Sequence, residues 1–140
     1  LSHTLYECKY HIVFCPKSRF RIFKGEIGEY AKQQTYILCR QKDLIEVMEL
    51  NVLEDHVHLV MSIPPKYSVS AVMGYLKGKL SIKLFQKYER LGKRFWGQHL
   101  WSRGFCVSTI GLDEEKIRKY VKWQETKEKE LERNQLGLFE

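Results

Sequence analysis

Long hydrophobic runs are missing from this chain of 140 residues. No apolar stretch approaches the ~18 residues that a membrane-spanning helix needs, and no signal-peptide pattern is visible, so we expect a cytoplasmic protein without a membrane partner. Internal repeats, low-complexity tracts and linker-like segments are missing as well. A chain of this length is typical of one domain with one hydrophobic core. The sequence therefore predicts a single domain over residues 1–140, with its core at about 5–110.

Cysteines are few, and no two of them form a C-x-x-C pair. The four are Cys8, Cys15, Cys39 and Cys106. A disulfide framework is typical of secreted chains, and nothing else here indicates secretion. Cys8 and Cys15 are expected on opposite faces of one strand, where a single metal ion cannot easily reach both. We expect four reduced thiols that help to fill the core.

Acidic residues are nearly absent between residues 66 and 103. Nine basic residues lie there against Glu89 alone, in a chain whose formal net charge is +7. Such a local excess favours a polyanionic partner, above all nucleic acid, over a plain solvated surface. Phe95 and Trp96 are candidates for base stacking or for the core. The residues that we expect to contact nucleic-acid phosphates are Lys17, Arg19, Arg21, Lys79, Lys83, Lys87, Lys93 and Arg94.

The hydrophobic pattern predicts four strands and three helices. The strands are expected at 6–15, 44–53, 56–63 and 100–110, and the helices at 25–42, from 69 after the N-cap Ser68, and at about 113–133, with a loop at 92–97. The first six elements match the ferredoxin-like split βαβ arrangement, an α+β fold with a four-stranded antiparallel sheet and helices on one face. The other face would be free for binding, and the C-terminal helix is an addition.

Two histidines stand in the predicted strand 56–63. His56 and His58 are separated by one residue, so both project from one face of the strand, while Val57 and Leu59 point to the other. The apolar face supplies the core without the histidines, so we expect these on the open face of the sheet. Two neighbouring imidazoles could bind a metal ion, or they could be partly exposed histidines without a ligand. The spacing alone leaves both interpretations open.

The last predicted helix carries Tyr120 and Gln124 one turn apart on one face. That face could simply be the buried stripe of an amphipathic helix. Alternatively, both side chains could approach one small site. An amide oxygen suits Mg²⁺ or Mn²⁺, and a tyrosine hydroxyl is a weak nucleophile that needs a metal or a base nearby. With His56 and His58, such a site could activate a phosphodiester for attack.

Five segments of the chain resemble one known family. They are CKYHIVFCPKSR, EDHVHLV, SVSAVMGYLKGK, LWSRGF and IRKYVKWQ, in this order. The segment from His56 to His58 is similar to the HUH motif (His, hydrophobe, His), and Tyr120 with Gln124 is similar to the helix that carries a single catalytic tyrosine. The chain thus resembles the small tyrosine transposases of insertion sequences that move as single-stranded DNA, over roughly residues 3–128.

This resemblance implies a DNA transposase that cleaves and rejoins single-stranded DNA at the ends of its insertion sequence. Tyr120 would attack a DNA phosphate and form a 5′-phosphotyrosine link, leaving a free 3′-OH. His56, His58 and Gln124 would hold Mg²⁺ or Mn²⁺. The partners would be DNA hairpins at the element ends and a second copy of the chain, with each active site shared between the two protomers. The sequence alone allows a site within one protomer equally well.

Other functions stay open. Repeat-associated HUH tyrosine transposases share this order of motifs, whereas relaxases place the tyrosine before the histidine pair and replication initiators usually carry further domains. The alternative from another class is a non-catalytic module that binds single-stranded nucleic acid on the same kind of sheet. Such a module needs neither the histidine pair nor the tyrosine, so its binding should be indifferent to a metal chelator.

Overall fold

The computed structural model describes residues 6, 8–95, 97, 99–110 and 114–137. The chain divides into two compact units, one formed by residues 8–110 and the other by residues 1–7 with 111–140. The boundary at residue 110 coincides with the predicted end of the core. That both units form one domain stays a prediction. Among the described residues, no helix combines the length and the hydrophobicity that crossing a membrane requires.

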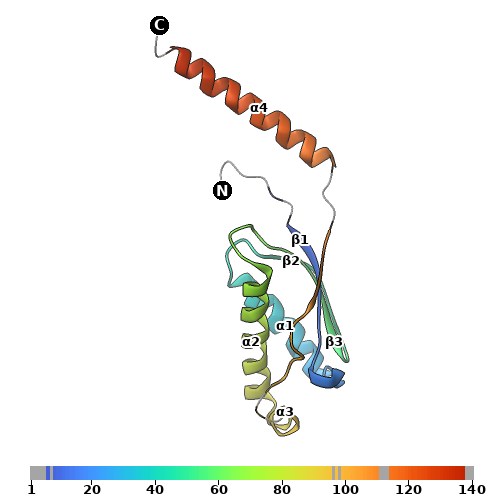
Figure 1. Cartoon of the computed structure of the whole chain (residues 1–140). Helices are drawn as coiled ribbons and strands as arrows, with labels where there is room; N and C mark the ends of the chain where they lie inside the picture. The colour runs from blue at the N-terminus through green and yellow to red at the C-terminus, as the bar shows by residue number, and fades with distance from the viewer. Residues whose placement is uncertain (1–5, 7, 96, 98, 111–113, 138–140) are drawn as a thin grey trace. The chain divides into compact units, whose positions relative to one another are not determined.

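An antiparallel sheet forms one layer of the unit 8–110. Its strands are β1 (Lys9–Phe14), β2 (Glu46–Leu53), β3 (His56–Ser62) and β4 (Cys106–Thr109), in the spatial order β2-β3-β1-β4. The helices α1 (Glu26–Arg40) and α2 (Val69–Lys87) both lie on one side of this sheet (Figure 1). The short helix α3 (Glu89–Arg94) follows α2, and a 3-10 turn, η1 (Lys17–Arg19), follows β1. The predicted α+β fold with a four-stranded antiparallel sheet is confirmed.

The hydrophobic core lies between the sheet and the two helices. Ile12 of β1 and Leu59 of β3 are fully buried, and Leu76, Leu80 and Leu84 of α2 are buried against them. α2 begins where the sequence predicts it, because the Ser68 hydroxyl accepts a hydrogen bond from the Ala71 amide at 3.0 Å. A cap of this kind typically contributes about 1 kcal/mol to helix stability.

The segment before β4 departs from the predicted strand at 100–110. Only Cys106–Thr109 forms a strand, and Trp101 makes an isolated bridge with Pro16. The Lys77 ammonium of α2 donates hydrogen bonds to the carbonyls of Ser102 at 3.0 Å and Gly104 at 2.8 Å. These carbonyls therefore bond to α2 instead of to a neighbouring strand. Burial lowers the pKa of Lys77, and the two carbonyls compensate for the lost water.

The predicted loop at 92–97 is partly helical, because α3 extends to Arg94. Leu91 is only 3% exposed and packs α3 against the core. Phe95 turns inward directly after it and packs edge-on against Phe20 and Phe85. Phe95 therefore belongs to the core and is not available for base stacking. Trp96 lies outside the described residues.

The four thiols differ in their surroundings. All are free, but only Cys39 on α1 is buried, and Cys106 on β4 is exposed. The expectation that all four fill the core is therefore wrong for Cys106, which lies at the edge strand where no helix covers it. Burial raises the pKa of Cys39 to about 12, so this thiol stays neutral at any ordinary pH.

The other unit contains α4 (Glu114–Gly137), which is longer than the predicted helix. Exposed ion pairs run along it, such as Lys119 with Glu115 at 3.3 Å, one turn apart. Positions 120 and 124 both lie in this helix. Position 113, where the predicted helix begins, lies outside the described residues.

Candidate metal centre and nucleic-acid interface

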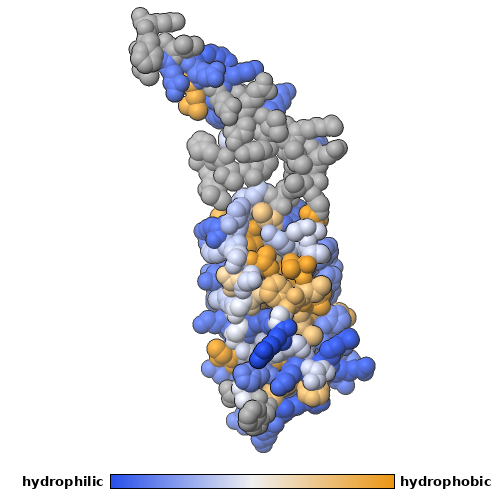
Figure 2. All heavy atoms as spheres, in the orientation of Figure 1, coloured by the Kyte–Doolittle hydropathy of each residue, from blue (hydrophilic) through white to orange (hydrophobic). Residues whose placement is uncertain are grey.

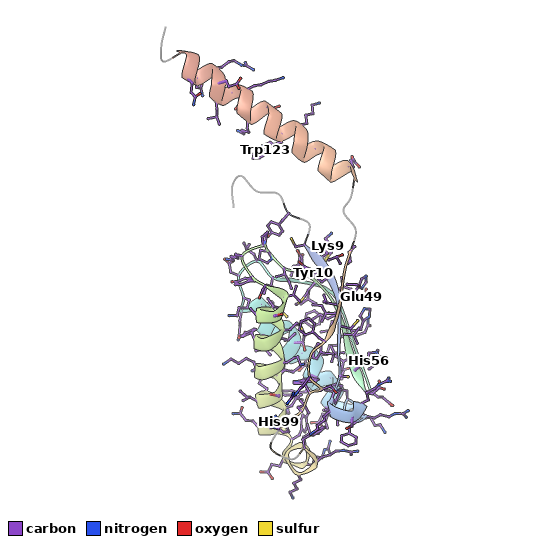
Figure 3. The ribbon with its side chains drawn as sticks, in the orientation of Figure 1. Lys9, Tyr10, Glu49, His56, His99 and Trp123 are labelled. Atoms are coloured by element: carbon purple, nitrogen blue, oxygen red, sulfur yellow. The ribbon has the colours of Figure 1, made fainter. Side chains whose placement is uncertain are left out.

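β3 separates its side chains into a covered and an open face. Val57, Leu59 and Met61 are fully buried under the helices, whereas His56 and His58 are only partly buried. Figure 3 labels His56 on the side of the sheet that faces away from α1 and α2. The predicted position of both histidines on the open face is therefore what the structure shows.

His56 is held by the residue that precedes it. Asp55 lies in the two-residue turn between β2 and β3, and its Oδ1 lies 2.8 Å from Nδ1 of His56. An ionised carboxylate can only accept, so Nδ1 carries the hydrogen and donates it. In a neutral imidazole this leaves Nε2 with the free lone pair that a metal ion requires. The hydrogen bond from His56 is the main cause that lowers the pKa of Asp55; burial opposes it and the Arg19 charge assists it.

Arg19 holds the same carboxylate from the other side. A guanidinium nitrogen of Arg19 donates to Oδ2 of Asp55 at 3.0 Å. Ser18 and Arg19 adopt left-handed backbone angles, with φ of 57° and 52°, which are unfavourable for residues other than glycine. The loop that follows β1 is joined to the turn between β2 and β3 by a hydrogen bond from the Phe23 amide to the Glu54 carbonyl at 3.0 Å. Arg19, predicted to contact phosphate, is thus engaged in an ion pair with Asp55.

His58 has different neighbours on the open face. In the register of the sheet it lies opposite Val13 of β1 and Asn51 of β2. Its ring stacks on that of His11, with the ring centroids 5.6 Å apart and the planes 17° apart. His11 lies two residues before Val13 on β1, so it shares the open face. The sequence pattern does not connect His11 with His58, because strand pairing decides that contact.

The donors for a metal ion are incomplete within the unit 8–110. Among the described residues, no three side chains of His, Cys, Asp or Glu come together in a way that could hold an ion. Two imidazoles with an available nitrogen still suit Mn²⁺, and a further oxygen donor would have to complete the set. The predicted donor, Gln124, and the predicted nucleophile, Tyr120, lie on α4 in the other unit. The structure describes the backbone of both residues but not their side chains, so their assignment stays a prediction.

A basic groove of about 550 Å³ lies where the loop after β1 meets α3. Five basic side chains line it, and its apolar wall consists of three aliphatic ones. No acidic residue lines this groove in the described part of the chain. The basic residues are Arg21, Lys24, Arg90, Lys93 and Arg94, and the aliphatic ones are Ile22, Ile27 and Leu91.

The groove brings together three of the predicted phosphate contacts and adds two. Arg21, Lys93 and Arg94 were expected from their charge, whereas Lys24 and Arg90 were not singled out. Arg21 also connects the groove to the histidine strand, because its guanidinium lies 4.0 Å from the carboxylate of Glu54, two residues before His56. The signal in the sequence was the charge itself; the folding of the loop onto α3 is what turns separate residues into one surface.

Three further predicted phosphate contacts, Lys79, Lys83 and Lys87, lie on α2, in the helical layer of the unit 8–110. Lys79 is exposed, Lys83 is partly exposed, and the ammonium of Lys87 lies 4.4 Å from the centre of the Tyr30 ring. Because α2 covers the sheet face opposite to the histidines, these lysines and the pair His56 and His58 are separated by the sheet. Lys17, the remaining predicted contact, is exposed in η1.

The sequence of the chain is similar to a known protein family and to individual members of it. Residues 4–124 match the family described as "Transposase IS200 like". The chain is 40% identical over 137 residues to the transposase for insertion sequence element IS200 of Salmonella typhimurium, covering 98% of this chain and 86% of the relative. It is 31% identical over 125 residues to the ISDra2 transposase TnpA of Deinococcus radiodurans, covering 89% of each chain.

Two solved structures share the fold. A transposase candidate from Deinococcus radiodurans superimposes with a TM-score of 0.69 at 24% identity, over 88% of this chain and 92% of the other. A tyrosine transposase associated with REP sequences, solved bound to a REP hairpin, has a TM-score of 0.55 at 12% identity, over 84% and 68%. At these identities the two structures support the fold alone. The family match and the two sequence relatives, which span nearly the whole chain, decide its membership: the chain belongs to the IS200-like transposase family.

Proposed function

We propose that this transposase cleaves and rejoins single-stranded DNA at the ends of an insertion sequence, through a covalent bond to Tyr120 and with a divalent metal ion. The observation that carries the proposal is the histidine pair on the open sheet face, with one ring oriented by Asp55 through its Nδ1. A non-catalytic binding module has no need for such an arrangement. The relatives at 40% and 31% identity favour an insertion-sequence transposase over the repeat-associated kind.

In the proposed reaction the tyrosine oxygen replaces a DNA oxygen at phosphorus. The Tyr120 hydroxyl gives up its proton, its oxygen forms a bond to the phosphorus, and the bond from phosphorus to the 3′ oxygen breaks. The 3′ oxygen takes a proton and leaves as a free 3′-OH, while the 5′ end stays on the enzyme. The number of phosphoester bonds is unchanged, so the strand can be rejoined without a further energy source. A divalent ion bound by His56, His58 and Gln124 would polarise the phosphate and stabilise the developing charge.

The basic groove is proposed to bind the phosphates of the DNA near the cleavage site. Its five cations lie on one surface, where they can contact successive phosphates. Arg21 connects this groove with the turn that carries Asp55, so a strand bound there would lead toward the histidine pair. The hairpin bound by the REP-associated relative is consistent with a hairpin partner for this chain.

A homodimer with shared active sites is part of the proposal. β4 is an edge strand whose four residues are all exposed, and such an edge can pair with another chain. Hydrophobic side chains also remain visible in the middle of the surface that Figure 2 shows for the unit 8–110. A mixture of a His56→Ala/His58→Ala chain with a Tyr120→Phe chain tests the sharing. Activity restored in the heterodimer supports it, and inactive heterodimers place each site within one chain.

The test of the proposed function is a covalent adduct on Tyr120. Wild-type protein incubated with Mn²⁺ and single-stranded DNA from the element ends should form an adduct that survives SDS. Tyr120→Phe removes only the hydroxyl, so this variant should bind the DNA and form no adduct. Tyr36→Phe is the matched control, since Tyr36 is an exposed tyrosine on α1. DNA binding without any adduct in wild type, with or without chelator, would instead indicate a binding module.

A further inference from the structure

We infer that Asp55 is a positioning residue for the metal site: it fixes the ring of His56 through Nδ1–H and so keeps Nε2 available for a divalent ion. This inference rests on the proposed function, because it takes His56 as a metal ligand. It goes beyond it, since it assigns a role to a residue that would not touch the ion itself.

The contact has the geometry that such a role requires. The distance from Nδ1 of His56 to Oδ1 of Asp55 is 2.8 Å, the length of a charge-assisted hydrogen bond. The side chain of His56 is 31% exposed, so without a partner its ring would be free to rotate and to exchange tautomers. A ring fixed in advance loses less freedom when it binds an ion. A carboxylate on the second ring nitrogen also fixes the tautomer and the orientation of a ligating imidazole.

Asp55 is itself held in place by groups from another part of the chain. Arg19 donates to Oδ2, the carboxylate oxygen that His56 does not use. The hydrogen bond from the Phe23 amide to the Glu54 carbonyl joins the same loop to the turn. Arg19 makes this ion pair from a left-handed backbone conformation, which has a conformational cost. Arg19, Asp55 and His56 thus form a chain of contacts that ends at the proposed ligand.

The two histidines are held by different means, and this makes the inference specific. His58 stacks on His11 and does not contact Asp55. A change at Asp55 should therefore alter the ring of His56 and leave that of His58 as it is. A general loss of folding would affect both.

The experiment combines ¹⁵N NMR of the imidazoles in the metal-free protein with Mn²⁺ titration followed by EPR. In wild type, neutral His56 should carry its hydrogen on Nδ1. Asp55→Ala should shift it toward Nε2–H, the commoner form of a free histidine, and weaken Mn²⁺ binding by about 10- to 100-fold. Asp55→Asn keeps an acceptor oxygen without the charge and should lie between the two. Asp43→Asn is the matched control, because Asp43 is an exposed aspartate paired with Lys66 at 2.9 Å.

Each outcome tests either the role of Asp55 or the metal site of the proposed function. An unchanged His56 tautomer in Asp55→Ala overturns the inference, as does an unchanged Mn²⁺ affinity when the tautomer has shifted. An equal loss of affinity in Asp43→Asn also overturns it, since the effect would then be one of general charge. Absence of Mn²⁺ binding in wild type overturns the metal site of the proposed function, and the inference with it.

Discussion

The two faces of β3 are built from alternate residues of one seven-residue strand, and they have different roles. Val57, Leu59 and Met61 are fully buried under α1 and α2, so their shapes are fixed by packing. His56 and His58 belong to the face that no helix of the unit 8–110 covers; a hydrogen bond to Asp55 holds His56, and ring stacking on His11 holds His58. One strand thus contributes to fold stability through its covered face and carries the candidate metal ligands on its open face. The packing of the covered face fixes the backbone that holds the two imidazoles.

The largest effect should come from the open face and should concern activity alone. His58→Ala is expected to reduce DNA cleavage to background, because one of two imidazole donors is lost. The free energy of unfolding should change by less than about 1 kcal/mol, since the ring is partly exposed. Cleavage assays and urea denaturation check the two parts. A variant that is unfolded, or one that cleaves normally, would contradict the separation of the faces.

The opposite change belongs to the covered face. Leu59→Ala should lower the free energy of unfolding by about 2–5 kcal/mol, because a fully buried side chain leaves a cavity. Ser62→Ala is the matched control on the open face of the same strand and should stay within about 0.5 kcal/mol. Denaturant titration of both variants measures the comparison. Similar losses at both positions would mean that the open face is also part of the core.

The basic groove should give a smaller and graded effect. Lys24→Ala and Lys93→Ala are each expected to weaken binding of single-stranded DNA and to reduce the slope of log K against log salt by about 0.7. Lys32→Ala, an exposed lysine of α1 outside the groove, should leave the slope unchanged. Fluorescence anisotropy between low and moderate salt is the measurement. Equal slopes for all three variants would remove the groove as the phosphate site.

The smallest effect concerns two thiols that differ in the same way as the two faces. Cys106 pairs with Val13 on the open face of the sheet and is exposed, whereas Cys39 is buried on α1 with its pKa raised to about 12. A thiol reagent at pH 8 should label Cys106 quickly and Cys39 only on unfolding. Mass spectrometry of the labelled peptides checks this order. Fast labelling of Cys39 in the folded protein would contradict its burial.

The sequence was sufficient for a four-stranded sheet, apart from the bounds of β4, and for the two faces of β3. Alternation along β3 predicted that Leu59 is buried and that His56 is not, because a period of two is fixed by strand geometry itself. The N-cap Ser68 was predictable for a similar reason, since capping is local. The charge excess between residues 66 and 103 also predicted a basic surface.

What the sequence could not show depends on contacts between distant segments. Lys77 is one of several lysines in α2, and only the fold shows that it bonds the carbonyls that were expected in a strand. The stacking of His11 on His58 depends on the register of β1 against β3. Arg19 looked like a phosphate contact because its partner, Asp55, lies 36 residues away in the chain.

The central claim is that the open face of β3 binds a divalent metal ion through its two histidines. The most direct measurement is pulsed EPR of Mn²⁺ added to the full chain, which detects the nitrogen of a coordinating imidazole. We expect nitrogen couplings from imidazole in wild type, their loss in His56→Ala/His58→Ala, and their presence in His99→Ala, a control with an exposed histidine outside the strand. Bound Mn²⁺ without imidazole couplings in wild type, or with couplings that persist in the double variant, would contradict the account.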